Sequence, residues 1–148
     1  MQIEDVRQAI GKETGVSGWV EVNQALVDQF AELTGDRQWI HVNAERARCE
    51  SPFGGTVAHG FLTVALLSRM VTEAVDLRAN AKLRVNYGFN RLRFPAPVMA
   101  GSRIRAHVTP NAVRDVESGV EIAWGVTVEI ENQSKPALAA EWLVRMYF

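Results

Sequence analysis

The sequence predicts an α+β fold in which a curved antiparallel sheet wraps around one long apolar helix. In the helix expected at residues 58–76, the first ten residues are apolar on nearly all sides, which is typical of a buried helix. From residue 82 onward the chain is rich in β-branched and aromatic residues and is broken by turn residues into strand-length runs. Short turns between consecutive runs predict an antiparallel meander with strands at 82–94, 102–113, 120–131 and 137–148.

The region before the long helix predicts smaller elements. Ile3, Val6 and Ile10 recur at helical spacing before Gly11, which indicates a short amphipathic helix. Residues 15–18 are expected to form a loop, and residues 19–22 have the residue pattern of a short strand. Residues 42–51 are polar and partly helical, and a tight loop at residues 52–55 leads into the long helix.

A second helix is predicted between an N-cap and a C-cap. Asn23 is a good N-cap, and Leu26, Phe30 and Leu33 lie on one face of the helix that follows. Gly35 stands where a helix C-cap belongs, and it allows the chain to turn.

Composition limits the classes of function. A chain of 148 residues suits one domain over residues 1–148, which can complete its core across a dimer interface. The apolar share of 47%, the net charge of -1 and the absence of a basic run argue against nucleic acid or an anionic membrane as partner. Cys49 is the only cysteine, so no intrachain disulfide forms. The charged N-terminus and the interrupted apolar region 57–75 predict a cytoplasmic protein without a membrane span.

The candidate chemistry lies between Gly35 and Gly60. Asp36 and His41 are five residues apart, which on one helix would place them about 140° apart around the axis. They converge only if the chain turns after Gly35. A second imidazole, His59, stands with Gly60 at the start of the apolar helix.

Two motifs resemble a known family. Gly-Asp-x-x-x-x-His at residues 35–41, followed by Pro-Phe-Gly-Gly-x-x-Ala-His-Gly-Phe-Leu at residues 52–62, resembles the MaoC-like dehydratases, or (R)-specific enoyl-CoA hydratases. Asn-Tyr-Gly-x-Asn-x-x-Arg-Phe-Pro-Ala-Pro-Val at residues 86–98 is similar to the subgroup containing nodulation protein N and short 3-hydroxyacyl-thioester dehydratases. The resemblance covers essentially the whole chain.

The resemblance implies a hot-dog fold, a homodimer and reversible hydration of trans-2-enoyl-CoA to (3R)-3-hydroxyacyl-CoA without a cofactor or metal. Carboxylate and imidazole are suitable acid–base groups. The resemblance implies that Asp36 and His41 hold the reacting water between them. The backbone N–H of Gly60, at a helix start, would polarise the thioester oxygen. The implied substrate-binding residues are Phe53, Gly55, His59, Asn86, Asn90 and Arg93.

Other interpretations of these residues stay open. Asp36 can be a local Asx-turn residue, and the ring of His59 can serve structure by fixing the preceding loop. The spacing of Asp36, His41 and His59 matches no helical metal motif. Many relatives carry serine where this chain has Ala65, which changes the lining of the pocket.

Two other functions compete with hydration. One is a hot-dog acyl-CoA thioesterase, which usually has an acidic residue within the central helix, whereas the first acid here is Glu73. The other is a non-catalytic acyl-CoA-binding subunit, which would not need the Asp36 and His41 pair.

Overall fold

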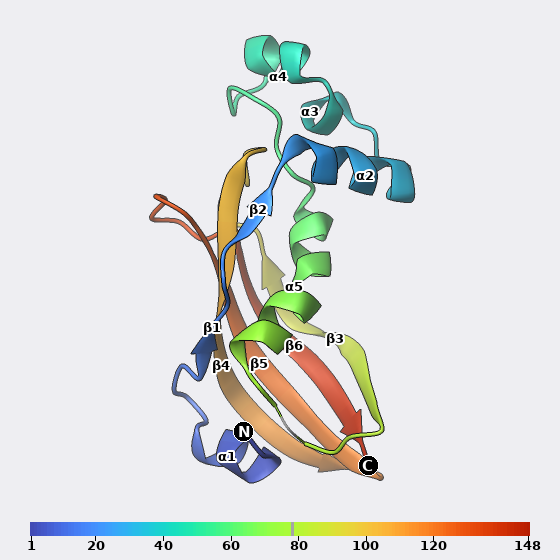
Figure 1. The fold of residues 1–148 in the computed structure, drawn as a ribbon, viewed down its shortest axis with the longest axis vertical. Coiled ribbons are helices and arrows are strands. Elements are labelled where there is room, and N and C mark those ends of the chain that lie inside the picture. The colour runs from blue at the N-terminus through green and yellow to red at the C-terminus, as the bar shows by residue number, and fades with distance from the viewer. Residues whose placement is uncertain (78) are drawn as a thin grey trace.

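The computed structural model describes residues 1–77 and 79–148 and shows one curved antiparallel sheet around helix α5 (Gly60–Ala74), as Figure 1 shows. The fold class is therefore the α+β arrangement that the sequence predicts. The strands are β1 (Gly15–Val16), β2 (Val20–Val22), β3 (Leu83–Arg93), β4 (Ser102–Val116), β5 (Gly119–Ile130) and β6 (Leu138–Tyr147). No helix in the described part of the chain is both long and apolar enough to cross a membrane.

The order of the strands corrects the predicted meander. Neighbours in the sheet run β1-β4-β5-β6-β3, and β2 also pairs with β4. The strands β4, β5 and β6 do form a meander, but β3 pairs with β6 and not with β4. The free side of β4 is occupied by β1 and β2, where Gly15 pairs with Val108 and Val20 pairs with Ile104. The two-residue strand β1 lies in the segment predicted as a loop, because strands this short leave little pattern in a sequence.

The predicted helix caps are confirmed. Helix α2 (Gln24–Thr34) begins after Asn23, whose side chain accepts a hydrogen bond from the backbone of Leu26. It ends at Gly35, which adopts the left-handed conformation with φ 78°. The remaining helices are α1 (Ile3–Gln8), α3 (Trp39–Val42) and α4 (Ala44–Glu50). In Figure 1, α2, α3 and α4 gather at one end of the molecule, next to the start of α5.

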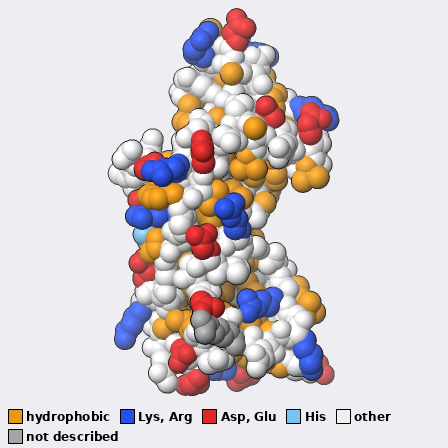
Figure 2. Space-filling model, in the orientation of Figure 1, with side chains coloured by type: hydrophobic (Ala, Val, Ile, Leu, Met, Phe, Trp, Pro, Cys, Tyr) orange, Lys and Arg blue, Asp and Glu red, His pale blue; other side chains and the backbone are white. Residues whose placement is uncertain are grey.

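Helix α5 packs on the concave face of the sheet with one side only. Leu67 and Met70 are fully buried against that face, which contributes most of the core (Ile104, Val108, Ile122, Val126, Leu138 and Met146). Phe61, in contrast, is 70% exposed, so the prediction of a helix buried on all sides is wrong for the single chain. Figure 2 shows hydrophobic side chains exposed at the level of α5. The apolar composition of this helix thus exceeds what its own sheet can cover.

Candidate active site

The predicted acid–base residues meet at the start of α5. The left-handed turn at Gly35 ends α2, and the short helix α3 then brings His41 back toward the loop before α5. As a result, Asp36, His41 and His59 each offer one side-chain donor atom, and these atoms all lie within 4.8 Å of one another. The turn that the sequence requires for this convergence is therefore present.

The ring of His41 has a defined tautomer. His41 is buried, and its Nδ1 lies 2.6 Å from the carbonyl oxygen of Val57. A carbonyl only accepts, so Nδ1 carries the proton and Nε2 of the neutral ring is left as the basic nitrogen. The backbone supports this contact, because the N–H of Val57 donates to the carbonyl of Ile40 at 3.0 Å.

His59 contacts both predicted catalytic residues. Its Nε2 donates to the backbone carbonyl of Asp36 at 2.9 Å, and its ring stacks on His41 with centroids 3.8 Å apart. The ring of Phe30 also contacts the ring of His59, with centroids 5.0 Å apart and 58° between the planes. Among the described residues, Nδ1 of His59 is the one fully buried side-chain polar atom without a hydrogen-bond partner. Both interpretations of His59 thus keep support: the ring fixes the loop, and one ring nitrogen is left unpaired.

Asp36 combines a local contact with an exposed carboxylate. Its Oδ1 accepts from the N–H of Gln38 at 3.4 Å, the pattern of an Asx turn, although the contact is long. The neighbouring Arg37 does not neutralise this carboxylate, because its guanidinium makes two hydrogen bonds of 2.7 Å to Glu32. Those bonds lower the pKa of Glu32 and raise that of Arg37. Asp36 therefore keeps oxygen atoms that can bind a water or a substrate group.

The same three side chains could be considered as metal ligands, since the structure brings together two imidazoles and a carboxylate. The lone pairs of imidazole lie in the ring plane, however, and the rings of His41 and His59 are stacked with only 23° between their planes. Stacked rings direct their lone pairs side by side and not toward one ion. The geometry suits hydrogen bonding to a small polar group better than coordination.

Two polar residues that the sequence interpretation missed hold this corner together. The side-chain amide of Gln24 donates to the carbonyl of His41 at 2.7 Å. The hydroxyl of Thr56 donates in turn to the amide oxygen of Gln24 at 2.5 Å. These contacts join α2, α3 and the loop before α5. They connect residues far apart in the chain, so no local sequence pattern signals them.

Gly60 lies beside an apolar groove. The first N–H groups of α5, which begins at Gly60, have no partner within the helix. A β-carbon at this position would lie 3.1 Å from the ring of Phe94, closer than normal packing allows. The groove has a volume of about 400 Å³ and is lined by Phe53, Ala58, Gly60, Thr63, Phe94, Pro95, Ala96, Pro97, Val98 and Ala137. Phe53, a predicted substrate contact, is thus near Gly60.

Two other predicted substrate contacts, Gly55 and Asn86, lie in different parts of the fold. A β-carbon on Gly55 would lie 3.0 Å from the terminal methyl of Met99, so this glycine permits tight loop packing. Asn86 lines a separate cavity beneath the second half of α5, where its Nδ2 lies 3.5 Å from the hydroxyl of Ser68.

Asn90 and Arg93 are not brought to Asp36 and His41 within this chain. Asn90 occupies a bulge of β3 and donates to Glu141 at 2.5 Å. Arg93 pairs with Ala139 in the register, and alternation places Ala139 on the same face as Glu141, opposite α5. The side chain of Asn90 therefore serves the sheet in this structure, and a substrate contact by Asn90 or Arg93 remains a prediction.

Comparison with known proteins adds family relationships to this geometry. A family model described as MaoC like domain matches residues 5–132. Nodulation protein N of Rhizobium meliloti (strain 1021) is 43% identical over 149 residues, which cover 100% of this chain and 92% of that protein. 3-Hydroxyacyl-thioester dehydratase Z of Mycobacterium tuberculosis (strain ATCC 25618 / H37Rv) is 46% identical over 144 residues, covering 97% of this chain and 94% of that protein.

The fold has a close counterpart among solved structures. The MaoC-like dehydratase from Rhodospirillum rubrum superposes with a TM-score of 0.81, at 23% identity, over 99% of this chain and 97% of that one. At this identity the likeness establishes the fold, which is the hot-dog arrangement of a sheet around a helix. The match over most of the chain and the full-length relatives show that this protein belongs to the MaoC-like dehydratase family.

Proposed function

We propose that this protein reversibly hydrates trans-2-enoyl-CoA to (3R)-3-hydroxyacyl-CoA. The observation that carries the proposal is the meeting of the Asp36 carboxylate with a buried His41 whose tautomer is set by Val57. The 46% identity to a protein named as a 3-hydroxyacyl-thioester dehydratase supports the same reaction class.

The reaction needs a base that activates water toward C3 and an acid that delivers a proton to C2. In hydration, the oxygen of water bonds to C3, one of its protons passes to the base, and a proton is delivered to C2. Asp36 and the free Nε2 of His41 share that water, and a positioned group of this kind typically contributes roughly 10²–10⁴-fold. Dehydration runs the same steps backwards, with the C3 hydroxyl leaving as water.

Negative charge builds on the thioester oxygen when C3 is attacked. The N–H of Gly60 at the start of α5 has no hydrogen-bond partner in the part of the chain that the structure describes. It supplies a fixed donor for that charge, and the helix dipole adds to it. The absence of a side chain lets the ring of Phe94 pack directly on the backbone at Gly60, where a β-carbon would lie 3.1 Å from that ring. The apolar groove beside Gly60 offers a path for the thioester arm.

The thioesterase alternative has weaker support. Its acid on the central helix would be Glu73, but the carboxylate of Glu73 accepts a hydrogen bond of 3.0 Å from the backbone of Gly18. Glu73 thus fastens the N-terminal segment to α5. A non-catalytic subunit would have no use for the ordered contacts around His41.

The protein is further proposed to act as a homodimer. Within residues 1–77 and 79–148, strand β3 pairs only with β6, so its outer edge is open in the single chain. Tyr87 on this strand is 53% exposed. Phe61 on α5 is exposed on the same molecule. Pairing with a second copy would cover the open edge and bury the exposed aromatic side chains.

The decisive experiment follows the enoyl-thioester absorbance after addition of crotonyl-CoA, with thiol release measured in parallel. Loss of the enoyl band without free thiol is the expected result. Rapid thiol release would establish a thioesterase instead. No change in either signal, from protein of native mass, would leave the non-catalytic subunit as the function.

A further inference from the structure

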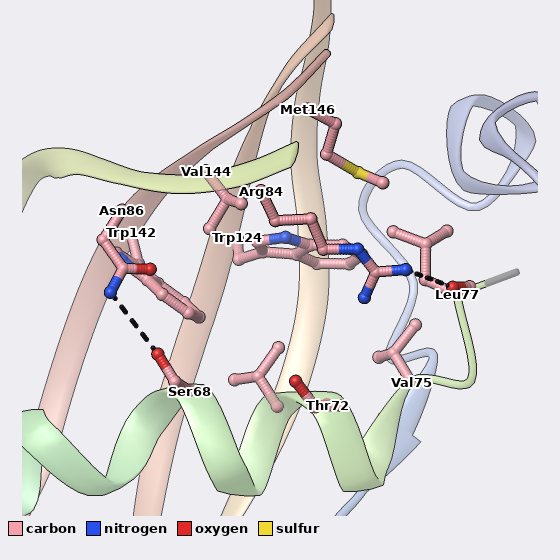
Figure 3. Close-up of a pocket in the computed structure, with 11 residues that line it drawn as sticks. Ser68, Thr72, Val75, Leu77, Arg84, Asn86, Trp124, Trp142, Val144 and Met146 are labelled. Atoms are coloured by element: carbon pink, nitrogen blue, oxygen red, sulfur yellow. Dashed lines mark hydrogen bonds between the residues drawn. The ribbon is translucent and has the colours of Figure 1, made fainter. Parts of the chain in front are cut away.

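A second cavity lies between the C-terminal half of α5 and the concave face of the sheet (Figure 3). Its volume is about 300 Å³, and it is separate from the groove at Gly60. It is lined by Ser68, Val71, Thr72, Val75, Leu77, Arg84, Asn86, Trp124, Trp142, Val144 and Met146. Apolar side chains form its floor, and the polar ones come from α5 and β3.

Two buried tryptophans leave unused donors in this cavity. Trp124 and Trp142 stand directly opposite each other on β5 and β6 and are 3% and 6% exposed. A buried indole N–H normally finds a hydrogen-bond partner. Neither indole N–H has one among the described residues, and neither nitrogen is sealed from solvent as Nδ1 of His59 is. Both rings line the cavity, so two indole N–H groups without a partner among the described residues belong to its wall.

The rim adds positive charge. Arg84 donates one N–H to the carbonyl of Leu77 at 2.7 Å, which holds the guanidinium at the cavity (Figure 3). Its other N–H groups have no hydrogen-bond partner among the described residues. Asn86 and the hydroxyls of Ser68 and Thr72 stand beside it. No Asp or Glu is among the described residues that line the cavity. An apolar floor with a cationic, donor-rich rim is complementary to an alkyl chain that ends in a carboxylate.

This cavity lies within reach of the thioester site. Ser68 is eight residues beyond Gly60 on α5, which corresponds to about 12 Å at the rise of an α-helix. Phe61, Ala65 and Thr72 share with Ser68 one face of the helix, and this face is exposed in the single chain. A medium-length acyl chain laid along that side would place its far end in the cavity.

We infer that the preferred substrate is a thioester whose acyl chain carries a carboxylate at its far end, bound by Arg84, Trp124 and Trp142. This inference rests on the proposed function for its chemistry, but the binding itself is independent of turnover. The carboxylate accepts from the guanidinium and the indole N–H groups, and the methylenes lie against the apolar floor.

The test compares trans-2-decenoyl-CoA with its counterpart bearing a terminal carboxylate. We expect kcat/KM to favour the carboxylated compound by roughly 10-fold or more, the range of a charged hydrogen bond. Arg84→Gln should abolish the preference, and Trp124→Phe should reduce it. Arg91→Gln, on the opposite face of β3, is the matched control and should keep it. Crotonyl-CoA, too short to reach the cavity, should be turned over equally by all of them.

Two outcomes would overturn the inference. One is equal or poorer use of the carboxylated compound by the wild-type protein, and the other is a preference that survives Arg84→Gln. If crotonyl-CoA is not hydrated at all, the proposed function fails, and the cavity is then tested by binding alone. In a Trp19→Phe/Trp39→Phe background, the fluorescence of Trp124 and Trp142 should respond to decanedioate and not to decanoate. An equal response, or none, would also overturn it.

Discussion

The imidazole rings of His41 and His59 are stacked, with centroids 3.8 Å apart and 23° between their planes. The same His59 ring donates to the carbonyl of Asp36. One buried histidine therefore orders both members of the proposed acid–base pair.

The first prediction concerns that ordering. His59→Phe keeps a ring that can stack on His41 but removes the hydrogen bond to the Asp36 backbone. Turnover of crotonyl-CoA should fall by about 10- to 100-fold, because a small misplacement of a catalytic group is costly. Thermal unfolding monitors the fold. Wild-type turnover in this variant would limit the role of His59 to packing.

The acid–base pair itself gives a second prediction. Asp36→Asn and His41→Gln should each lower kcat by roughly 10²–10⁴-fold with little change in stability, since both replacements are near-isosteric. Glu45→Gln, an exposed carboxylate on α4, serves as the control and should keep full activity. A variant of either predicted residue that keeps more than about a tenth of wild-type kcat would exclude that residue from the mechanism.

The third prediction separates packing from chemistry at Gly60. Gly60→Val should lower turnover by about 10²–10³-fold, because the side chain holds the thioester away from its donor. It should also destabilise the protein, since a β-carbon added at this position would lie 3.1 Å from the ring of Phe94. Adding Phe94→Leu should restore stability while turnover stays low. Recovery of turnover together with stability would show that Gly60 serves only packing.

A fourth prediction concerns the pH dependence of stability. It rests on His107, which lies on the face of the sheet opposite α5. His107 is held between Glu129 at 2.8 Å and Glu13 at 3.0 Å. The hydrogen bond to Glu129, with that to Glu13, raises the pKa of His107 above 6.5 despite partial burial. The stabilisation from the charged ring is complete below the unfolded pKa of His107 and is lost as pH rises through the higher folded value.

Urea unfolding of wild type and His107→Gln at several pH values checks this. The difference in unfolding free energy should be largest at about pH 6, where Glu129 stays ionised because Arg105 and His107 lower its pKa. It should shrink as the pH is raised to about 9, where the histidine is neutral. A difference that grows with pH would contradict the assigned direction of the shift.

The fifth prediction concerns assembly. Light scattering should give about twice the chain mass at micromolar concentration, since the open edge of β3 and the exposed Phe61 need cover. Phe61→Glu should weaken the dimer, whereas Leu33→Glu should not, although Leu33 on α2 is even more exposed than Phe61. An active wild-type monomer would contradict the proposed homodimer.

The sequence by itself determined the local elements of this protein. Asn23 and Gly35 mark the ends of α2 because capping depends only on the hydrogen bonds and backbone conformation of adjacent residues. The β-branched runs after residue 82 mark the long strands for the same reason. The motif residues from Asp36 to Gly60 also indicated the family, because motif and spacing are properties of the chain alone.

Tertiary structure decided which segments meet. The pairing of β3 with β6 depends on β1 and β2 occupying the side of β4, and strands of two and three residues carry almost no signal. Asn90 looked like a site residue in its motif. In the fold, Asn90 and Asn111 both occupy bulges and both donate to Glu141, at 2.5 and 2.7 Å. The sharing of the Glu141 carboxylate by Asn90 and Asn111 depends on contacts between distant residues. The same holds for the two indoles that line one cavity. Such contacts exist only once the sheet has closed around α5.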